Sequence, residues 1–345
     1  MKIPLLRIGF LSLFITGLVL SATAQQANGN EEIFSQIRQE AEAIGSVRSL
    51  LIQQNGERLL EQYYHGMQPG RKMNTKSASK SIISLLVGIA VEEGIINSID
   101  DPIAQYLPEY FEDISNEKKQ AITVKNLLTM RSGLETTSFH NYGRWVTSDD
   151  WVRYVLEQPM IKEPGGEWAY STGSSHLLSV IITKTSGMST RAFANKYLFR
   201  PMNIEVGGWD HDPQGYYMGG NNLALSSEAM MKIGQMLLNG GTWNGKRIIS
   251  ELWMNDSFKS YTRSNYNPYN YGYLWWNRPV AGHKVYFAWG YGGQYIFMIP
   301  DLDAVVVILS SLNTATQRRE YKEPVFRLLR RLIIPQLLEA EAVSP

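Results

Sequence analysis

Cysteine is absent from all 345 residues of the sequence. The chain therefore forms no disulfide and uses no thiolate, so its stability must come from a hydrophobic core. A surplus of charge of one sign is lacking as well. The sequence has 33 lysines and arginines and 32 aspartates and glutamates, so its formal net charge is +1. A chain without a basic surplus is not expected to bind nucleic acid or an anionic membrane surface. We expect a small-molecule substrate instead.

Long hydrophobic runs are missing beyond the N-terminus. There, Lys2 and Arg7 precede an apolar run over residues 8–20 and a small-residue Ala-Thr-Ala. This order is typical of a cleavable signal peptide, so we expect residues 1–24 to be removed and the mature chain, 25–345, to be periplasmic or secreted. Its formal net charge then changes from +1 to −1, because two basic residues are lost. No later run has the length of a transmembrane helix, so no membrane span is expected in the mature chain.

Motifs for two other classes of hydrolase are missing too. The histidines His140, His176, His211 and His283 stand apart, without the spacing of metal ligands. Gly-x-Ser-x-Gly, the nucleophile motif of α/β-hydrolases, does not occur. We therefore expect neither a metal nor a cofactor. His176 fits a buried core histidine, which we favour, or a residue that supports an active site from behind.

Strand-like patterns occur at both ends of the chain. Residues 47–52 and 58–64 are joined across Asn-Gly, the strongest short hairpin signal. Further β-branched and aromatic runs, which look like an antiparallel meander, lie near the C-terminus at 271–276, 284–289, 294–299 and 304–309.

Helical patterns fill the middle of the chain and flank these strands. Residues 33–43 and 323–338 are expected to form helices, the second with an apolar side suited to packing on a sheet. We therefore predict a single α+β domain of the α/β/α sandwich type. Its antiparallel sheet comes from both chain ends, about 33–75 and 265–345, and is flanked by helices. A large, mainly helical lobe, about 76–264, is inserted between these ends.

The stretch from Thr75 to Val91 is the strongest candidate for a catalytic element. Its apolar residues are too dense for a surface helix, which predicts a central, buried one. At its polar end Ser77 and Lys80 stand three residues apart, so their side chains share one face of a helix. Burial would favour the neutral lysine that a general base requires. Alternatively, Ser77 merely caps a core helix.

Four motifs occur in an order that resembles one known superfamily. The chain resembles the serine β-lactamases and penicillin-binding proteins, in the branch with class C β-lactamases, related esterases and 6-aminohexanoate-dimer hydrolases. The residues that carry the resemblance are Ser77-x-x-Lys80, residues 122–134 (ITVKNLLTMRSGL), residues 164–171 (PGGEWAYS) and Gly290-Tyr291-Gly292-Gly293-Gln294. Residues 170–178 and 289–294 look most like the 6-aminohexanoate-dimer hydrolases. The resemblance covers nearly all of the mature chain and implies the β-lactamase/transpeptidase-like fold.

The resemblance implies a role for each motif. Ser77 would be the acylated nucleophile, and Lys80 would accept its proton. Tyr170 would move a proton between Ser77 and the leaving group. The backbone amides of Ser77 and Gly293 would form the oxyanion hole. Two structural alternatives stay open, namely that Tyr170 fills a wall of the core and that the glycines only serve a hairpin turn.

Substrate contacts are expected at residues beside or within these motifs, namely Trp168, Thr172, Tyr291 and Gly292. Two positions depart from the family pattern. Thr172 stands where Tyr-x-Asn has asparagine, and Gly290-Tyr291-Gly292 replaces the basic motif of the third strand. That basic residue helps to hold a substrate carboxylate, so we expect β-lactams and D-Ala-D-Ala peptides to be poor substrates.

The sequence thus predicts an exported serine hydrolase that cleaves an amide or ester through a Ser77 acyl-enzyme. One alternative is a non-catalytic descendant of the same fold that binds peptidoglycan or a protein partner. The other is a true β-lactamase or DD-peptidase.

Overall fold

The computed structural model describes residues 31–311 and 321–343. The expected signal peptide, residues 1–24, lies outside the described residues. In the part of the chain that is described, no helix is long and apolar enough to cross a bilayer.

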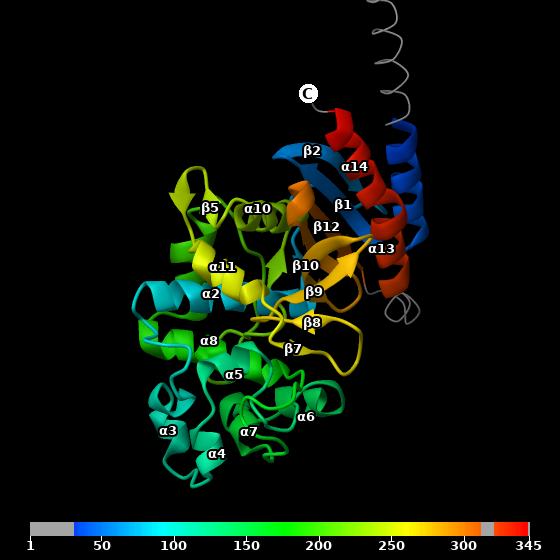
Figure 1. The fold of residues 1–345 in the computed structure, drawn as a ribbon. Helices are drawn as coiled ribbons and strands as arrows, with labels where there is room; N and C mark the ends of the chain where they lie inside the picture. Colours follow the sequence, from blue (N-terminus) through cyan, green and yellow to red (C-terminus); the bar gives the residue numbers. More distant parts are fainter. Residues whose placement is uncertain (1–30, 312–320, 344–345) are drawn as a thin grey trace, which may run out of the picture.

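One antiparallel sheet of eight strands organises the molecule, and its strands come from both ends of the chain (Figure 1). The strand order across the sheet is β2-β1-β12-β11-β10-β9-β8-β7. The predicted fold class, an antiparallel sheet with a helical insertion, is confirmed. The strands are β1 Val47–Gln54, β2 Glu57–Tyr63, β7 Thr262–Arg263, β8 Asn270–Tyr271, β9 Trp276–Val280, β10 His283–Gly290, β11 Gln294–Ile299 and β12 Ala304–Ser310.

Two tight hairpins build the sheet locally. Between β1 and β2, Asn55 and Gly56 both have positive φ, at 51° and 78°, which suits the twist of paired strands and confirms the predicted hairpin. The β9–β10 turn repeats this geometry at Ala281 and Gly282, with φ of 50° and 89°. The sequence gives no Asn-Gly there, so the position of this second turn was not predicted.

The strand predicted at residues 271–276 is wrong. Tyr271 pairs with Trp276, so the residues between them form the turn from β8 to β9. Leu274 has a φ of 61°, and its amide donates to the carbonyl of Leu128, outside the sheet. The strand itself is β9, which begins only at Trp276 and includes Pro279, outside the predicted range. Aromatic residues raised the strand signal here, but Tyr273 and Trp275 pack against Trp253 and Phe258 instead.

Helices cover both faces of the sheet (Figure 1). Residues 31–43 form one helix, and the C-terminal helix lies beside it, continuing through α13 Lys322–Leu328, η6 Leu329–Ile333 and α14 Ile334–Val343. Phe326 of this helix meets Phe287 and Phe297 of the sheet, with ring centroids 5.6 and 5.5 Å apart. On the opposite face lies α10, Ser227–Leu238, whose Gly234 sits against Val305 of β12.

The remaining helices gather in a lobe beside the sheet (Figure 1). Short two-stranded pairs and single turns connect them. The helices are α2 Ser79–Glu92, α3 Pro108–Phe111, α4 Glu117–Gln120, α5 Val124–Leu128, α6 Tyr142–Val146, α7 Trp151–Glu157, α8 Thr172–Ser186, α9 Thr190–Ala194 and α11 Glu251–Phe258; the turns are η1 Lys76–Ala78, η2 Ile103–Gln105, η3 Phe139–Asn141 and η4 Asn195–Phe199; the short strands are β3 Met73–Asn74, β4 Ala224–Leu225, β5 Thr242–Trp243 and β6 Lys246–Arg247. One further turn, η5 Pro300–Leu302, lies in the sheet lobe between β11 and β12.

Helix α2 is the buried element that the sequence predicts. Every residue from Ser79 to Ala90 is buried. At Gly88 an added Cβ would lie 2.5 Å from the ring of Trp253, so glycine lets α11 pack directly on the helix. Gly94 follows with a φ of 67°, as expected of a residue just beyond a helix end. At the other end of α2, η1 and the first turn of the helix pack against β10 of the sheet.

Candidate active site

Ser77 lies in η1, the single 3₁₀ turn that leads into α2. The residue before it, Lys76, has a left-handed φ of 53°, and its amide is held by the Asn74 side chain at 2.8 Å. The Ser79 hydroxyl donates to the Lys76 carbonyl at 2.6 Å. These local hydrogen bonds fix the turn that carries Ser77.

Lys80 follows one helical turn later, and its amine meets three oxygen atoms. Nζ donates to Ser77 Oγ at 3.2 Å, to Thr172 Oγ1 at 3.2 Å and to the carbonyl oxygen of Gly220 at 2.6 Å. Only 1% of the Lys80 residue is exposed. The three contacts leave the amine aimed at the Ser77 hydroxyl.

The surroundings of Lys80 favour its neutral form. All three oxygen partners are uncharged, and no carboxylate of the described residues pairs with the amine. Burial lowers the pKa of Lys80 to about 7, because a buried ammonium loses its hydration without gaining a counter-ion. At neutral pH a large fraction of this lysine is therefore a free amine that can accept a proton.

Tyr170 brings a third polar group to Ser77. It lines the same cavity as Ser77, and its ring centroid lies 4.9 Å from the Lys80 amine. Burial raises the pKa of Tyr170 well above its ordinary value, and the nearby Ser77 hydroxyl offsets only part of that shift. The phenol therefore stays protonated at neutral pH, so it can donate a proton.

The segment that carries Tyr170 is pinned to the end of α5. The amides of Gly165 and Ala169 donate to the carbonyls of Arg131 and Met130 at 2.8 Å each. The Arg131 side chain donates to the carbonyl of Gly166 at 2.6 Å. These hydrogen bonds join two of the family-like motifs, 122–134 and 164–171, so that one holds the other in place.

Thr172 occupies the first turn of α8 and links Lys80 to a residue that sequence analysis missed. Its hydroxyl lies 2.8 Å from the Ser138 hydroxyl, which also accepts the Thr172 amide at 2.8 Å. Ser138 lies in a loop before η3 and carries no motif. Only the tertiary structure brings it to the site, so no local signal could have identified it.

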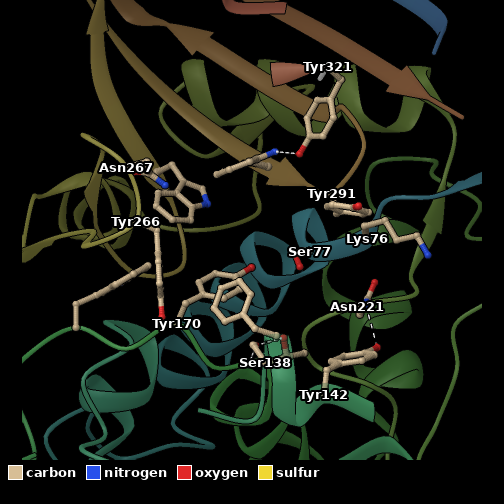
Figure 2. A pocket seen from close by; sticks show the side chains of 15 residues that line it. Lys76, Ser77, Ser138, Tyr142, Tyr170, Asn221, Tyr266, Asn267, Tyr291 and Tyr321 are labelled. Atoms are coloured by element: carbon tan, nitrogen blue, oxygen red, sulfur yellow. Dashed lines mark hydrogen bonds between the residues drawn. The ribbon is translucent and has the colours of Figure 1, made fainter. Parts of the chain in front are cut away.

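A cavity of about 940 Å³ opens above Ser77 (Figure 2). Its walls are mostly aromatic, and Tyr291, which is 50% exposed, stands at the rim. Of the described residues that line it, none is an aspartate or glutamate. The lining residues are Lys76, Ser77, Ser138, Phe139, Tyr142, Trp168, Tyr170, Thr172, Asn221, Tyr266, Asn267, Trp276, Trp289, Tyr291 and Tyr321.

The structure brings most of the predicted site residues together. Ser77, Lys80 and Tyr170 meet, and Trp168, Thr172 and Tyr291 line the same cavity. Gly292 is buried and does not line the cavity.

Gly293 lies in the turn between β10 and β11. Its amide donates to the carbonyl of Gly290 at 3.2 Å, so in this structure that amide serves the turn. An added Cβ at Gly290 would lie 2.0 Å from the carbonyl oxygen of Thr75, two residues before Ser77. The turn thus approaches Ser77 closely, while the assignment of Gly293 to an oxyanion hole stays a prediction.

His176 is fully buried in α8. Its Nε2 lies 2.9 Å from Asp212 Oδ2, and its Nδ1 accepts the amide of Gly219 at 3.4 Å. Because Nδ1 accepts a hydrogen bond, the proton of a neutral imidazole is on Nε2, which donates a hydrogen bond to Asp212. His176 is thus a core residue with satisfied hydrogen bonds, as favoured from the sequence. It lies close to Gly220, the residue after Gly219, whose carbonyl holds Lys80, while a role of His176 in supporting the site stays a prediction.

No group of three or more side chains that could bind a metal ion occurs in the part of the chain that the structure describes.

Comparisons with known proteins point to one family. A protein-family model described as beta-lactamase matches residues 31–329. The 6-aminohexanoate-dimer hydrolase of Paenarthrobacter ureafaciens is 22% identical over 290 residues, which cover 76% of this chain and 72% of that protein.

Solved structures share the fold at low sequence identity. EstCE1, a hydrolase with promiscuous acyltransferase activity, superposes with a TM-score of 0.73 at 16% identity, over 88% of this chain and 99% of that one. A D-stereospecific amidohydrolase from Streptomyces sp. superposes with a TM-score of 0.62 at 16% identity, over 79% of this chain and 92% of that one.

Proposed function

This chain belongs to the beta-lactamase family of serine hydrolases, and from that premise we propose that it cleaves an amide or ester through an acyl-enzyme on Ser77. The observation that carries the proposal is the 3.2 Å contact between Ser77 Oγ and a buried lysine amine whose hydrogen-bond partners are all uncharged oxygens. A hydroxyl beside a free amine is an activated nucleophile.

The proton transfers follow from the two pKa shifts. Neutral Lys80 takes the proton of Ser77 Oγ while the oxygen bonds to the substrate carbonyl carbon. Tyr170, still protonated, gives its proton to the departing amine or alcohol and regains one from the Lys80 ammonium. A water molecule then enters in place of the leaving group, and its oxygen bonds to the acyl carbonyl carbon while Lys80 takes its proton. The bond between Ser77 Oγ and the acyl carbon breaks, Lys80 and Tyr170 pass the proton back to Ser77 Oγ, and the acyl group leaves as a free acid.

The negative charge of the tetrahedral intermediate needs backbone donors. The amide of Ser77 is the first, and the β10–β11 turn would supply the second, with Gly293 as the assignment from sequence. Because Gly293 donates to Gly290 at 3.2 Å, this assignment implies a small rearrangement of the turn when substrate binds.

The walls of the cavity favour linear amides or esters over β-lactams. β10 ends in Trp289 and Gly290, followed by Tyr291, so this strand end offers no cation to a β-lactam carboxylate. The relatives support the same substrate classes, since they include a 6-aminohexanoate-dimer hydrolase and a D-stereospecific amidohydrolase.

A fluorophosphonate probe tests the proposal directly. The wild-type protein should be labelled at one site, Ser77→Ala should not be labelled, and Ser115→Ala, in the second Ser-x-x-Lys of the chain, should behave as wild type. Equal labelling of wild type and Ser77→Ala would rule out the proposed nucleophile and favour the non-catalytic, partner-binding alternative. Turnover of nitrocefin faster than that of simple esters would instead favour a β-lactamase.

We also propose that the protein is exported, on the basis of residues 1–24. The mass of the mature protein recovered from the periplasm or medium would correspond to a chain that starts at Gln25. Recovery of the full-length chain from the cytoplasm alone would contradict this.

A further inference from the structure

The cavity above Ser77 carries one charged side chain among its described lining residues, Lys76. Its ammonium has no carboxylate within ion-pair distance among the described residues. Asp210 is the acidic group that acts on it electrostatically, but this carboxylate accepts the side chain of Asn222 at 2.7 Å. A partly buried cation without a close partner, at the wall of a binding cavity, is free to meet an anion of the ligand.

Lys76 lies at the cavity wall with a left-handed backbone conformation that is unfavourable for lysine. The residue has a φ of 53°, a conformation that costs a lysine about 1 kcal/mol or more relative to glycine. The Asn74 side chain caps its amide, and the same side chain donates to Asn222 at 2.8 Å. The hydrogen bonds of Asn74 therefore hold the strained backbone that places Lys76 at the cavity wall.

Polar groups accompany Lys76 on one side of the cavity. β3 pairs with β4 through Asn74 and Ala224, which brings Lys76 close to residues 221–223. Asn221 lines the cavity, and its amide nitrogen donates to the Tyr142 hydroxyl at 3.1 Å. Figure 2 shows Lys76, Asn221 and Tyr142 on one side of Ser77, with Tyr266 and Asn267 on the other.

The other side of the cavity is mainly aromatic. Trp168 lies 5.9 Å from the Tyr170 ring and 5.8 Å from the Tyr266 ring, and Trp276 stacks beside Tyr170 at 6.0 Å. Such a wall buries an aliphatic or aromatic group and offers no charge to pair with. The two sides therefore suit the two ends of one amphipathic molecule.

Resting on the proposed function, we propose that the substrate is an amide or ester with an apolar group on one side and a carboxylate on the other, and that Lys76 binds the carboxylate. The carboxylate of the substrate would lie a few bonds from its scissile carbonyl, because Lys76 directly precedes Ser77 and carries a flexible four-carbon stem. This recognition differs from that of β-lactams, because the cation lies beside the nucleophile and not on the third strand.

Matched ester pairs test the inference. In the acyl pair, mono-p-nitrophenyl glutarate is compared with p-nitrophenyl pentanoate, which replaces the carboxylate by a methyl group. In the leaving-group pair, 3-carboxy-4-nitrophenyl pentanoate is compared with the same neutral ester. The measured quantity is kcat/KM for the anionic ester divided by kcat/KM for the neutral one. Comparing this ratio between protein variants cancels the intrinsic reactivity of the esters.

We expect Lys76→Gln to lower the ratio about tenfold in one of the two pairs, the size of a partly exposed charge-assisted contact. Lys76→Glu should lower it further, and Lys76→Arg should largely retain it. The control is Lys72→Gln, which removes a nearby lysine that pairs with Glu205 at 3.0 Å and does not line the cavity; it should leave the ratio unchanged. The pair that responds shows on which side of the scissile bond the carboxylate lies.

Two outcomes would overturn the inference in distinguishable ways. If Ser77-dependent hydrolysis of the neutral ester is intact and the ratio does not change in either pair with Lys76→Gln, the carboxylate site is wrong and the proposed function stands. If no ester is hydrolysed and Ser77 is not labelled, the proposed function fails, and this inference fails with it.

Discussion

The amine of Lys80 lies 2.6 Å from the carbonyl oxygen of Gly220, the shortest of its three hydrogen bonds. A carbonyl oxygen orients an amine without supplying the full charge that a carboxylate would. Lys80 is thus held in place and left able to lose its proton near neutral pH. The position and the basicity of the proposed base depend on the same contact.

Gly220→Ala should therefore disable the site. An added Cβ would lie 2.3 Å from Ser175 Oγ and 3.1 Å from the Lys80 amine, so the segment or the lysine must move. We expect kcat/KM to fall about 100-fold or more, as for a misplacement of about 1 Å, and stability to fall by roughly 1–3 kcal/mol. Gly208→Ala, where nothing lies within 4 Å of the added Cβ, is the control. Similar activity of the two variants would contradict the role of Gly220.

The pH dependence of the reaction should reflect Lys80. Because burial lowers its pKa to about 7, the fraction of free amine rises as pH rises through that value. We expect kcat/KM for a neutral ester to increase about tenfold per pH unit below this pKa and to level off above it. The raised pKa of Tyr170 predicts no decline from its ionisation up to about pH 10. A profile that is flat from pH 5 to 8 would exclude Lys80 as the base.

Lys80→Met should produce a more stable but inactive protein. The folded chain holds Lys80 with a pKa of about 7, whereas the unfolded chain holds it near 10.5. Between these values the unfolded state binds the extra proton, so this residue makes stability rise with pH across that window and costs most below it. After allowing for the lost hydrogen bonds, we expect a gain of about 1–3 kcal/mol at pH 7.

Denaturant unfolding at pH 7 and pH 9 measures this gain. The stabilisation by Lys80→Met should be smaller at pH 9, because part of the cost of the buried lysine has already disappeared in the wild type. A variant that is less stable than wild type at both pH values would mean that the three hydrogen bonds outweigh the buried charge.

The His176–Asp212 pair should contribute strongly to stability. Neither side chain is exposed to solvent, and His176→Phe would leave both Asp212 and the amide of Gly219 short of a partner. We expect a loss of about 3–5 kcal/mol, as for other buried pairs that lose one member, and a smaller loss for His176→Gln, whose amide can still donate to Asp212. The matched control is His140→Phe, since the His140 side chain is 68% exposed. Equal unfolding free energies for both phenylalanine variants would contradict this assignment.

Local patterns predicted the elements that local physics determines. The Asn55-Gly56 turn favours positive φ by its residue types, and the density of apolar residues after Lys80 requires a buried helix. The three-residue spacing of Ser77 and Lys80 fixes their contact once that helix forms. These features need no information from distant parts of the chain.

Contacts between distant residues could not be predicted in this way. Gly220 holds Lys80 from 140 positions away, and Ser138 reaches Thr172 from 34 positions away. Neither residue has a chemical type that marks it as functional. Residues 271–276 misled for the opposite reason, because their aromatic composition resembles a strand while Leu274 adopts the left-handed backbone of a turn.

Tyr170→Phe separates the two steps in which this residue is proposed to act. The ring, which stacks beside Trp276 at 6.0 Å, stays in place, and only the hydroxyl is lost. Because p-nitrophenolate leaves without being protonated, whereas an anilide nitrogen must be protonated, we expect a p-nitroanilide to lose about 10²–10⁴-fold in kcat/KM. The p-nitrophenyl ester of the same acid should lose clearly less. Equal losses for both substrates would mean that Tyr170 acts on Ser77 and not on the leaving group.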